Sequence, residues 1–284
     1  MTVRAEIRRW LPPRRPGELH TVFVRACLPG NPTGAQDLES WLELGGGLAA
    51  LRANPNPFKS NLPALAYAIE LRGEKAPPSL RAVLGFTQMV EPLRTTRYLA
   101  IIERLNGLME DAGVSSLLGG DAATAQIAYP KAEARHITAV TIIAETQALP
   151  ALQALCRADG FVQERTLGGG LELKAASGAR VVLLDRLFPT DRSPMVDELL
   201  ADRSGGLSLL STPLLFVCCC ITGYPPIAAS HVPAMIDAAM LASLLSSDEW
   251  TTVAELRARV PREPLLAALR YLRDALGVPV PLKI

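Results

Sequence analysis

The chain has 284 residues, of which 49% are hydrophobic and 20% charged, and its formal net charge is +1 at pH 7. This composition excludes a disordered chain, and the length allows one large domain or two modest ones. A net charge this close to zero gives no strong signal for nucleic-acid binding. The first 25 residues are locally basic, which fits a solvated arm or, less well, a phosphate-binding segment.

Targeting and membrane signals are not evident, so we expect a cytoplasmic protein with no membrane partner. The N-terminus has no apolar stretch of the kind that marks a secretory signal. The most apolar run, residues 207–221, is interrupted by Ser211 and Pro213 and predicts a buried helix rather than a membrane span. The five cysteines include no CxxC pair, which fits buried thiols in a reducing compartment better than a disulfide or zinc site.

The first third of the chain predicts a helical region behind a basic, proline-rich start. Residues 21–26 are apolar and partly β-branched, which is typical of a short strand. Pro92 is expected to end one helix, and Gly113 is expected to end the next. The expected helices cover residues 37–53 with a glycine interruption at 45–47, then 62–72, 80–90 and 98–109.

The pattern changes at residue 114, where short apolar runs begin to alternate with helical ones. Up to residue 188 the order is β-α-β-α-β-β-β, which predicts a small mixed sheet with helices packed on it. From residue 195 the pattern is helical again. The expected strands are 114–118, 137–144, 161–166, 171–176 and 180–187, and the helices are 121–129, 149–159, 195–202, 214–222, 232–245, 252–260 and 264–276.

These patterns together predict an α+β protein in three parts. Residues 1–92 form a basic N-terminal arm and a helical subdomain, residues 93–190 form the core with its mixed sheet, and residues 191–284 form a C-terminal helical domain.

The most informative motif is the glycine pair Gly119-Gly120, between the first strand and the helix that follows it. Paired glycines let the backbone approach a phosphate, and the N–H groups at a helix start face the anion. His136 and Thr138 stand at the expected start of the next strand, where alternate residues share one face.

Several short motifs, in their order along the chain, carry a resemblance to a known family. Leu117-Leu118-Gly119-Gly120 precedes a helix, Asp159-Gly160-Phe161 closes another, residues 177–185 supply a later strand, and Asp248-Glu249-Trp250 lies near the start of a C-terminal helix. Together they resemble a poorly characterised bacterial nucleotidyltransferase family of the DNA-polymerase-β-like nucleotidyltransferase superfamily.

The resemblance implies a nucleotidyltransferase core flanked by N-terminal and C-terminal helical regions. Members of the family transfer a nucleoside monophosphate from a triphosphate with two Mg²⁺ ions, held by two aspartates at alternate strand positions and a third on a neighbouring strand. In our alignment these positions hold His136, Thr138 and Leu183. The resemblance therefore implies a degenerate metal site with no metal ligands assigned, and Mg²⁺ and a nucleoside triphosphate are cofactors only if the protein is active.

Two sets of candidate site residues follow from this alignment. His136, Thr138 and Asp185 are candidates for a catalytic role, although Asp185 also fits a surface ion pair and His136 a buried strand histidine. The candidates for nucleotide binding are Gly119, Gly120, Asp121, Lys131 and Arg135, of which Asp121 also fits a helix-start acid and the two basic residues also fit solvated charges.

Three functions remain open from the sequence. The first is a pseudoenzyme that keeps the fold and serves as an accessory binding protein for a protein or peptide partner, with a nucleotide as a further ligand. The second is an active transferase that moves a nucleotide to a small molecule, peptide or protein with non-standard ligands. The third is a mainly helical interaction protein in which the resemblance is fortuitous.

Overall fold

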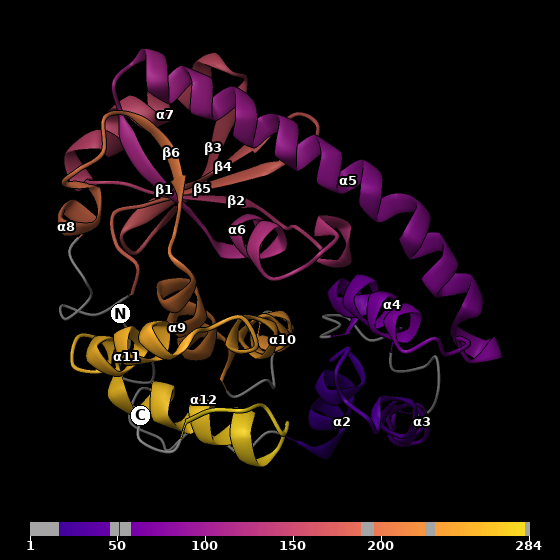
Figure 1. The fold of residues 1–284 in the computed structure, drawn as a ribbon. Coiled ribbons are helices and arrows are strands. Elements are labelled where there is room, and N and C mark those ends of the chain that lie inside the picture. Colours follow the sequence, from indigo (N-terminus) through magenta and orange to yellow (C-terminus); the bar gives the residue numbers. More distant parts are fainter. Residues whose placement is uncertain (1–16, 46–50, 52–57, 189–195, 225–230, 282–284) are drawn as a thin grey trace, which may run out of the picture.

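The computed structural model of the chain describes residues 17–45, 51, 58–188, 196–224 and 231–281. Within these residues, helices surround a mixed sheet of six strands in the order β3-β4-β5-β2-β1-β6 (Figure 1). The expected α+β class is therefore confirmed. The basic residues of the first 16 positions lie outside the described residues.

The sheet is mixed because its central strands run in both directions. β2 lies between β1, to which it is antiparallel, and β5, to which it is parallel. β4 and β3 continue the sheet beyond β5 as antiparallel neighbours, and β6 pairs with β1 in parallel. The strands are β1 (Ser115–Gly119), β2 (Val140–Ile143), β3 (Phe161–Leu167), β4 (Gly170–Ala175), β5 (Arg180–Leu184) and β6 (Gly206–Leu209).

Single-turn 3-10 helices aside, the elements from β1 to β5 follow the predicted order β-α-β-α-β-β-β. Two details differ from the expectation. β2 begins at Val140, three residues later than expected, and the apolar run 207–221 is divided between β6 and α9 (Thr212–Gly223) instead of forming one helix. β6 forms by pairing with a strand about ninety residues away, and local periodicity does not carry that information.

Residues 21–26 form part of a helix, α2 (Glu18–Ala26), and the expected strand there is wrong. Phe23 of α2 packs against Trp41 and Phe58, with ring centroids 4.9 and 4.8 Å away. This aromatic cluster buries the apolar side of the helix, and such tertiary packing outweighs the weak strand preference of the local sequence.

α5 (Pro78–Asp111) is a single helix of 34 residues that continues through Pro92, where two helices were expected. An interior proline removes one backbone hydrogen bond at a cost of about 3 kcal/mol. Burial of Leu84, Tyr98 and Leu105 along one side of α5 offsets that cost. The expected boundary between residues 92 and 93 therefore falls inside a continuous helix.

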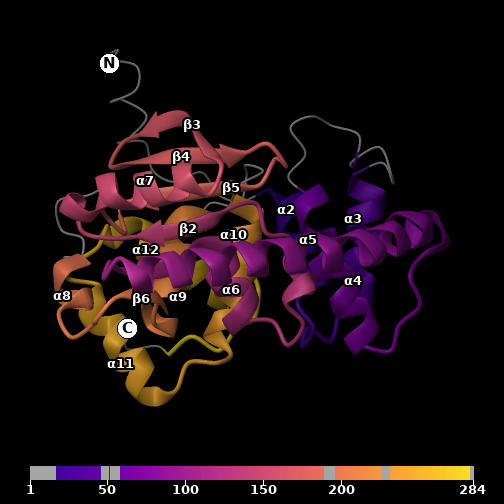
Figure 2. The same cartoon turned by 90° about the horizontal axis from the view of Figure 1, so that it is seen from above.

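The helices form layers on both sides of the sheet. α5 and α7 lie on one side, α9 to α12 lie on the other, and α2 to α4 pack near the N-terminal end of α5 (Figures 1 and 2). None of the helices in the described ranges has the length and apolar character needed to cross a bilayer. The remaining helices are α3 (Gly34–Leu44), α4 (Leu62–Leu71), α6 (Gly120–Ile127), α7 (Leu149–Ala158), α8 (Val196–Leu200), α10 (His231–Ala242), α11 (Ser247–Leu256) and α12 (Arg262–Asp274).

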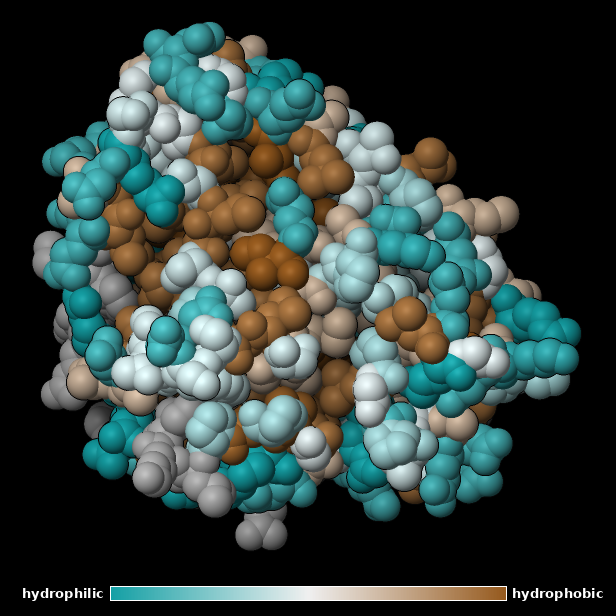
Figure 3. Space-filling view, viewed as in Figure 1, coloured by the Kyte–Doolittle hydropathy of each residue, from teal (hydrophilic) through white to brown (hydrophobic). Residues whose placement is uncertain are grey.

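β6 is an edge strand of the sheet, and hydrophobic side chains gather over this part of the molecule (Figure 3). The backbone N–H of Leu207 donates to Asn106 Oδ1 of α5 at 2.7 Å. A side chain that occupies an edge N–H reduces pairing with strands of other chains. α5 therefore protects the sheet edge as well as covering one face.

α5 also holds the segment that leads into β2. The buried Tyr98 donates its hydroxyl to the backbone carbonyl of Thr138 at 2.9 Å. Through this bond α5 fixes the backbone at Thr138, next to the candidate site.

The Tyr98→Phe variant should lower the free energy of unfolding by about 1 kcal/mol, because it removes this hydrogen bond and leaves the Thr138 carbonyl unsatisfied. Chemical denaturation measures the change, with Tyr67→Phe on α4 as the control that should cost less. Equal losses in the two variants would contradict a specific role for the Tyr98 hydroxyl.

Candidate functional site

A cavity of about 500 Å³ lies between one face of the sheet and helices α9 and α10. Much of its lining is apolar or neutral, and a polar cluster beside Gly120 interrupts it. The lining includes Thr141, Ile143, Arg180, Leu184, Leu210, Leu215, Cys218, Thr222 and Pro233, together with Asp121, Arg135, Thr138 and Asp237 of the polar cluster.

The glycine pair lies directly against β2. Gly119 ends β1 and pairs with Thr141, and Gly120 begins α6 with a φ of +60°, a conformation that favours glycine. A Cβ at Gly120 would lie 2.7 Å from Thr141 Oγ1, and one at Gly119 would lie 2.9 Å from Ile143 Cδ1. Gly120 therefore needs glycine, because of both its positive φ and its contact with Thr141, whereas at Gly119 a shift of the Ile143 side-chain end would make room for a Cβ.

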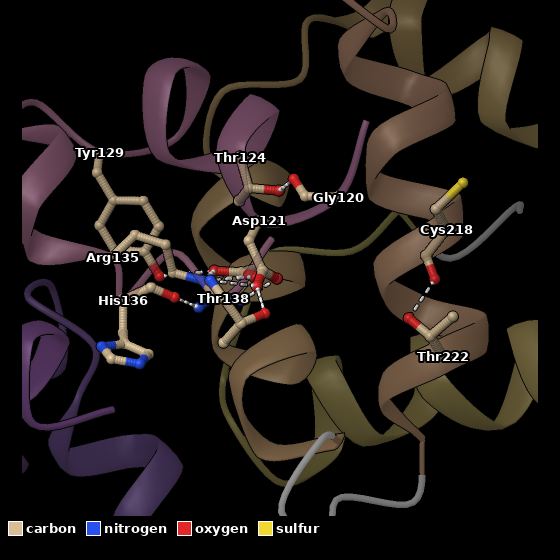
Figure 4. Close-up of polar contacts among 10 residues, drawn as sticks. Gly120, Asp121, Thr124, Tyr129, Arg135, His136, Thr138, Cys218 and Thr222 are labelled. Carbon is tan, nitrogen blue, oxygen red and sulfur yellow. Dashed lines mark hydrogen bonds and ion pairs between the residues drawn. The ribbon is translucent and has the colours of Figure 1, made fainter. Parts of the chain in front are cut away.

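His136 and Thr138 do not lie on β2, which corrects their expected place on a strand. They belong to the segment that precedes Val140. The His136 ring turns away from Asp121 and Thr138 (Figure 4), and its Nδ1 lies 2.8 Å from Glu91 Oε1 of α5. His136 is thus a partly buried residue that contacts α5, and only Thr138 of this pair reaches the cavity.

Leu183, which we aligned with the third aspartate of the family, does not face the cavity. Leu183 is fully buried and alternates with the residues of β5 that line the cavity, Arg180 and Leu184, so it faces the opposite side of the sheet. Asp185 follows β5, and its carboxylate accepts a hydrogen bond from Arg186 Nε at 2.6 Å. Asp185 is not among the cavity residues, and its surface ion pair is the alternative that the sequence left open.

The polar cluster is built around the guanidinium of Arg135. Its Nε lies 2.9 Å from both carboxylate oxygens of Asp237. One terminal nitrogen donates to Asp121 Oδ1 at 2.8 Å, and Figure 4 shows this contact between Arg135 and Asp121. The Tyr129 hydroxyl donates to Asp237 Oδ1 at 2.8 Å, and Thr138 donates its backbone N–H to Asp121 Oδ2 at 3.0 Å and its hydroxyl to the same oxygen. The structure thus brings together Gly119, Gly120, Asp121, Arg135 and Thr138 from the predicted set.

Asp237 and Tyr129 complete the cluster, and they are not among the site residues predicted from the sequence. Asp237 is 2% exposed and Arg135 is 4% exposed. The available signal was an aspartate inside the apolar run of α10, because a charged residue in a buried helix is almost always paired. The partner is 102 residues away in sequence, so the signal alone does not identify it.

Burial raises the pKa of Asp237 to about 6, against the attraction of Arg135, which lowers it. Burial also lowers the pKa of Arg135, but Asp121 and Asp237 raise it by more, so that the guanidinium stays charged. The pKa of Tyr129 is raised well above its usual value by burial and by the neighbouring Asp237, which keeps its hydroxyl a hydrogen-bond donor. The Arg135 guanidinium thus lies between the carboxyl groups of Asp237 and Asp121.

These residues do not fit a Mg²⁺ site. Mg²⁺ needs carboxylate oxygens in octahedral geometry, whereas the cavity residues of β2 and β5 are threonine, isoleucine, leucine and arginine. All four carboxylate oxygens of Asp121 and Asp237 already accept hydrogen bonds from the cluster. Over the described ranges, no group of three or more His, Cys, Asp or Glu residues is placed to hold a metal ion.

Two further sets of residues take no part in the polar cluster. Lys131 forms an exposed ion pair with Glu70 of α4 at 3.0 Å, which is the solvated role that the sequence allowed.

None of the five cysteines forms a disulfide. Cys218 lines the cavity, but burial raises the pKa of its thiol to about 12, which makes it a poor nucleophile at neutral pH.

In comparisons with known proteins, no family model matches this chain and no curated protein matches its sequence. The chemistry of the site is therefore inferred from its own residues.

Replacing Arg135 with methionine should lower the free energy of unfolding by about 3–5 kcal/mol, because it leaves two carboxylates without their buried partner. The matched control is Lys131→Met, which removes a surface ion pair and should cost less than about 1 kcal/mol. Chemical denaturation compares the two, and similar losses would contradict the central place of Arg135.

The raised pKa of Asp237 predicts a specific pH dependence. The folded protein holds a proton on this carboxyl more tightly than the unfolded chain, whose pKa is near 3.8, so the contribution of Asp237 to stability grows as the pH falls through about 6. The free energy of unfolding of the wild type minus that of Asp237→Asn should therefore rise between pH 7 and 4.5, by up to about 3 kcal/mol. A difference that falls on acidification would show a lowered pKa and contradict this result.

Proposed function

We propose that the protein is a nucleotidyltransferase-fold pseudoenzyme that acts as an accessory binding protein. Support for the fold comes from β1, the glycine pair and α6, followed by β2, which lies between β1 and β5 in the sheet. This is the sequence of elements that the resemblance implies around a phosphate-binding backbone. The glycine pair stands at the start of α6, where the resemblance implies a phosphate-binding backbone, and Gly120 has a positive φ next to Thr141.

The observation that carries the proposal is the loss of acidic side chains from the cavity face of the sheet. Thr141 and Ile143 of β2 and Leu184 of β5 line the cavity, and none of them supplies a negative charge for Mg²⁺. The two carboxylates nearby, Asp121 and Asp237, belong to the Arg135 cluster. The cavity is lined by two acidic and two basic side chains, those of Asp121, Asp237, Arg135 and Arg180, so it offers no excess positive charge to attract a triphosphate.

The same lining favours a different type of occupant. A cavity with mostly apolar or neutral walls and a few fixed polar groups suits a small neutral ligand or an apolar side chain of a partner better than a highly charged nucleotide. This supports a binding role without group transfer.

The alternatives are less well supported. An active transferase needs carboxylates free to bind metal, and Asp121 and Asp185 are each engaged by an arginine. A mainly helical interaction protein does not fit a six-stranded sheet within the described residues.

Isothermal titration calorimetry with Mg-ATP, and mass spectrometry after incubation with all four nucleoside triphosphates, test the proposal. We expect no heat that depends on Mg²⁺ and no added nucleoside monophosphate on the protein or on supplied acceptors. Tight triphosphate binding that requires Mg²⁺, or any transfer, would contradict it.

Two double variants, compared for a gain of Mg²⁺ binding, give the proposal a second test. The double variant Thr141→Asp with Ile143→Asp places carboxylates at alternate positions of β2, and both native residues line the cavity together with Gly120. It should gain measurable Mg²⁺ binding, whereas His136→Asp with Thr138→Asp should gain less because His136 turns toward α5. Stronger Mg²⁺ binding by the variant His136→Asp with Thr138→Asp would instead support the alignment that puts the family's two aspartates at residues 136 and 138.

A further inference from the structure

The N-terminal half of α5 exposes a stripe of large apolar side chains. Phe86, Met89 and Leu93 are 64%, 68% and 74% exposed. Their spacing of three and four residues places them on one line along the helix, opposite the side that buries Leu84 and Glu91. Single exposed hydrophobic residues are common on protein surfaces, but three in a line on one helix mark a contact surface. We call these three residues the α5 stripe.

The charges around the α5 stripe are basic. Between residues 78 and 100 the charged residues are Arg81, Arg94, Arg97 and Glu91. Glu91 lies on the buried side, 9% exposed at its side chain, and it forms ion pairs with both His136 and Arg94. Arg81 and Arg97 are exposed and are the arginines that remain to act on a partner. A partner on the stripe therefore meets positive charge at its margins.

We propose that the α5 stripe docks an acidic amphipathic helix of a partner protein. An amphipathic helix presents apolar residues at the same three- and four-residue spacing, and its acidic margins would lie beside the arginines. Phe86 to Leu93 spans two turns, or about 10 Å, so a partner helix of three or four turns covers the stripe. This inference rests on the proposed accessory role and names the class of partner for it.

A second copy of this chain fits the stripe less well. Two α5 stripes packed on each other would bring arginines of one copy next to arginines of the other, and like charges at an interface cost binding energy. Charge complementarity thus favours an acidic partner over self-association.

The test uses the full chain and two fluorescein-labelled designed peptides of 18 residues. Both carry leucines at helical spacing of three and four, and one has glutamates at the flanking positions where the other has lysines. Fluorescence anisotropy at low salt should show at least tenfold tighter binding of the glutamate peptide, with a difference that shrinks as salt is added. Equal binding of the two peptides, or binding of neither, would overturn the proposal.

Two substitutions locate the binding surface. Leu93→Glu should weaken binding of the glutamate peptide at least tenfold, and the control Leu244→Glu, at an exposed leucine outside α5, should leave it unchanged. Thermal unfolding checks that both variants are folded. Equal loss in both variants would overturn the proposal, as would a dimer of the wild type that Leu93→Glu dissociates.

A charge reversal tests the acidic character of the partner. The double variant Arg81→Glu with Arg97→Glu should shift the preference toward the lysine peptide, and an unchanged preference would overturn the charge assignment. These results are separable from the function of the cavity, since nucleotide transfer by the wild type would refute the pseudoenzyme while leaving peptide binding to the α5 stripe intact.

Discussion

The buried guanidinium of Arg135 joins the parts of the structure that form the candidate site. It connects Asp121 at the start of α6 with Asp237 in the middle of α10, and it lies three residues before Thr138 on the segment that enters β2. Charges this deeply buried are stable only when every partner is present. Through Asp121, this cation ties the start of α6, next to Gly120, to α10 and to the segment that precedes β2.

The same network determines what the cavity can bind. In a metal-dependent transferase the carboxylates near the glycine pair are available to Mg²⁺, whereas here their oxygens are occupied by donors of the protein itself. The guanidinium of Arg135 lies between the two carboxylates and is held by both, so these side chains bind one another. This internal pairing is consistent with the proposed binding role without metal-dependent transfer.

The sequence predicted those features that depend on neighbouring residues. The glycine pair, the strand before it and the helix after it form as expected, because glycine freedom and apolar periodicity are local properties. The expectation failed where distant residues decide. His136 and Thr138 stop short of β2 because pairing with β1 and β5 sets where that strand begins. α5 continues through Pro92 because its buried side is packed on both sides of the proline, and Asp237 finds its partner only in the folded chain.

The most direct test of the internal ion cluster is a crystal structure of the protein grown with Mg²⁺ and a non-hydrolysable nucleoside triphosphate. We expect Arg135 to remain within hydrogen-bond distance of both Asp121 and Asp237, with no metal density beside Gly120. A Mg²⁺ ion bound by Asp121 or Asp237, with the Arg135 side chain displaced, would contradict the claim that this ion cluster is closed to metal ions.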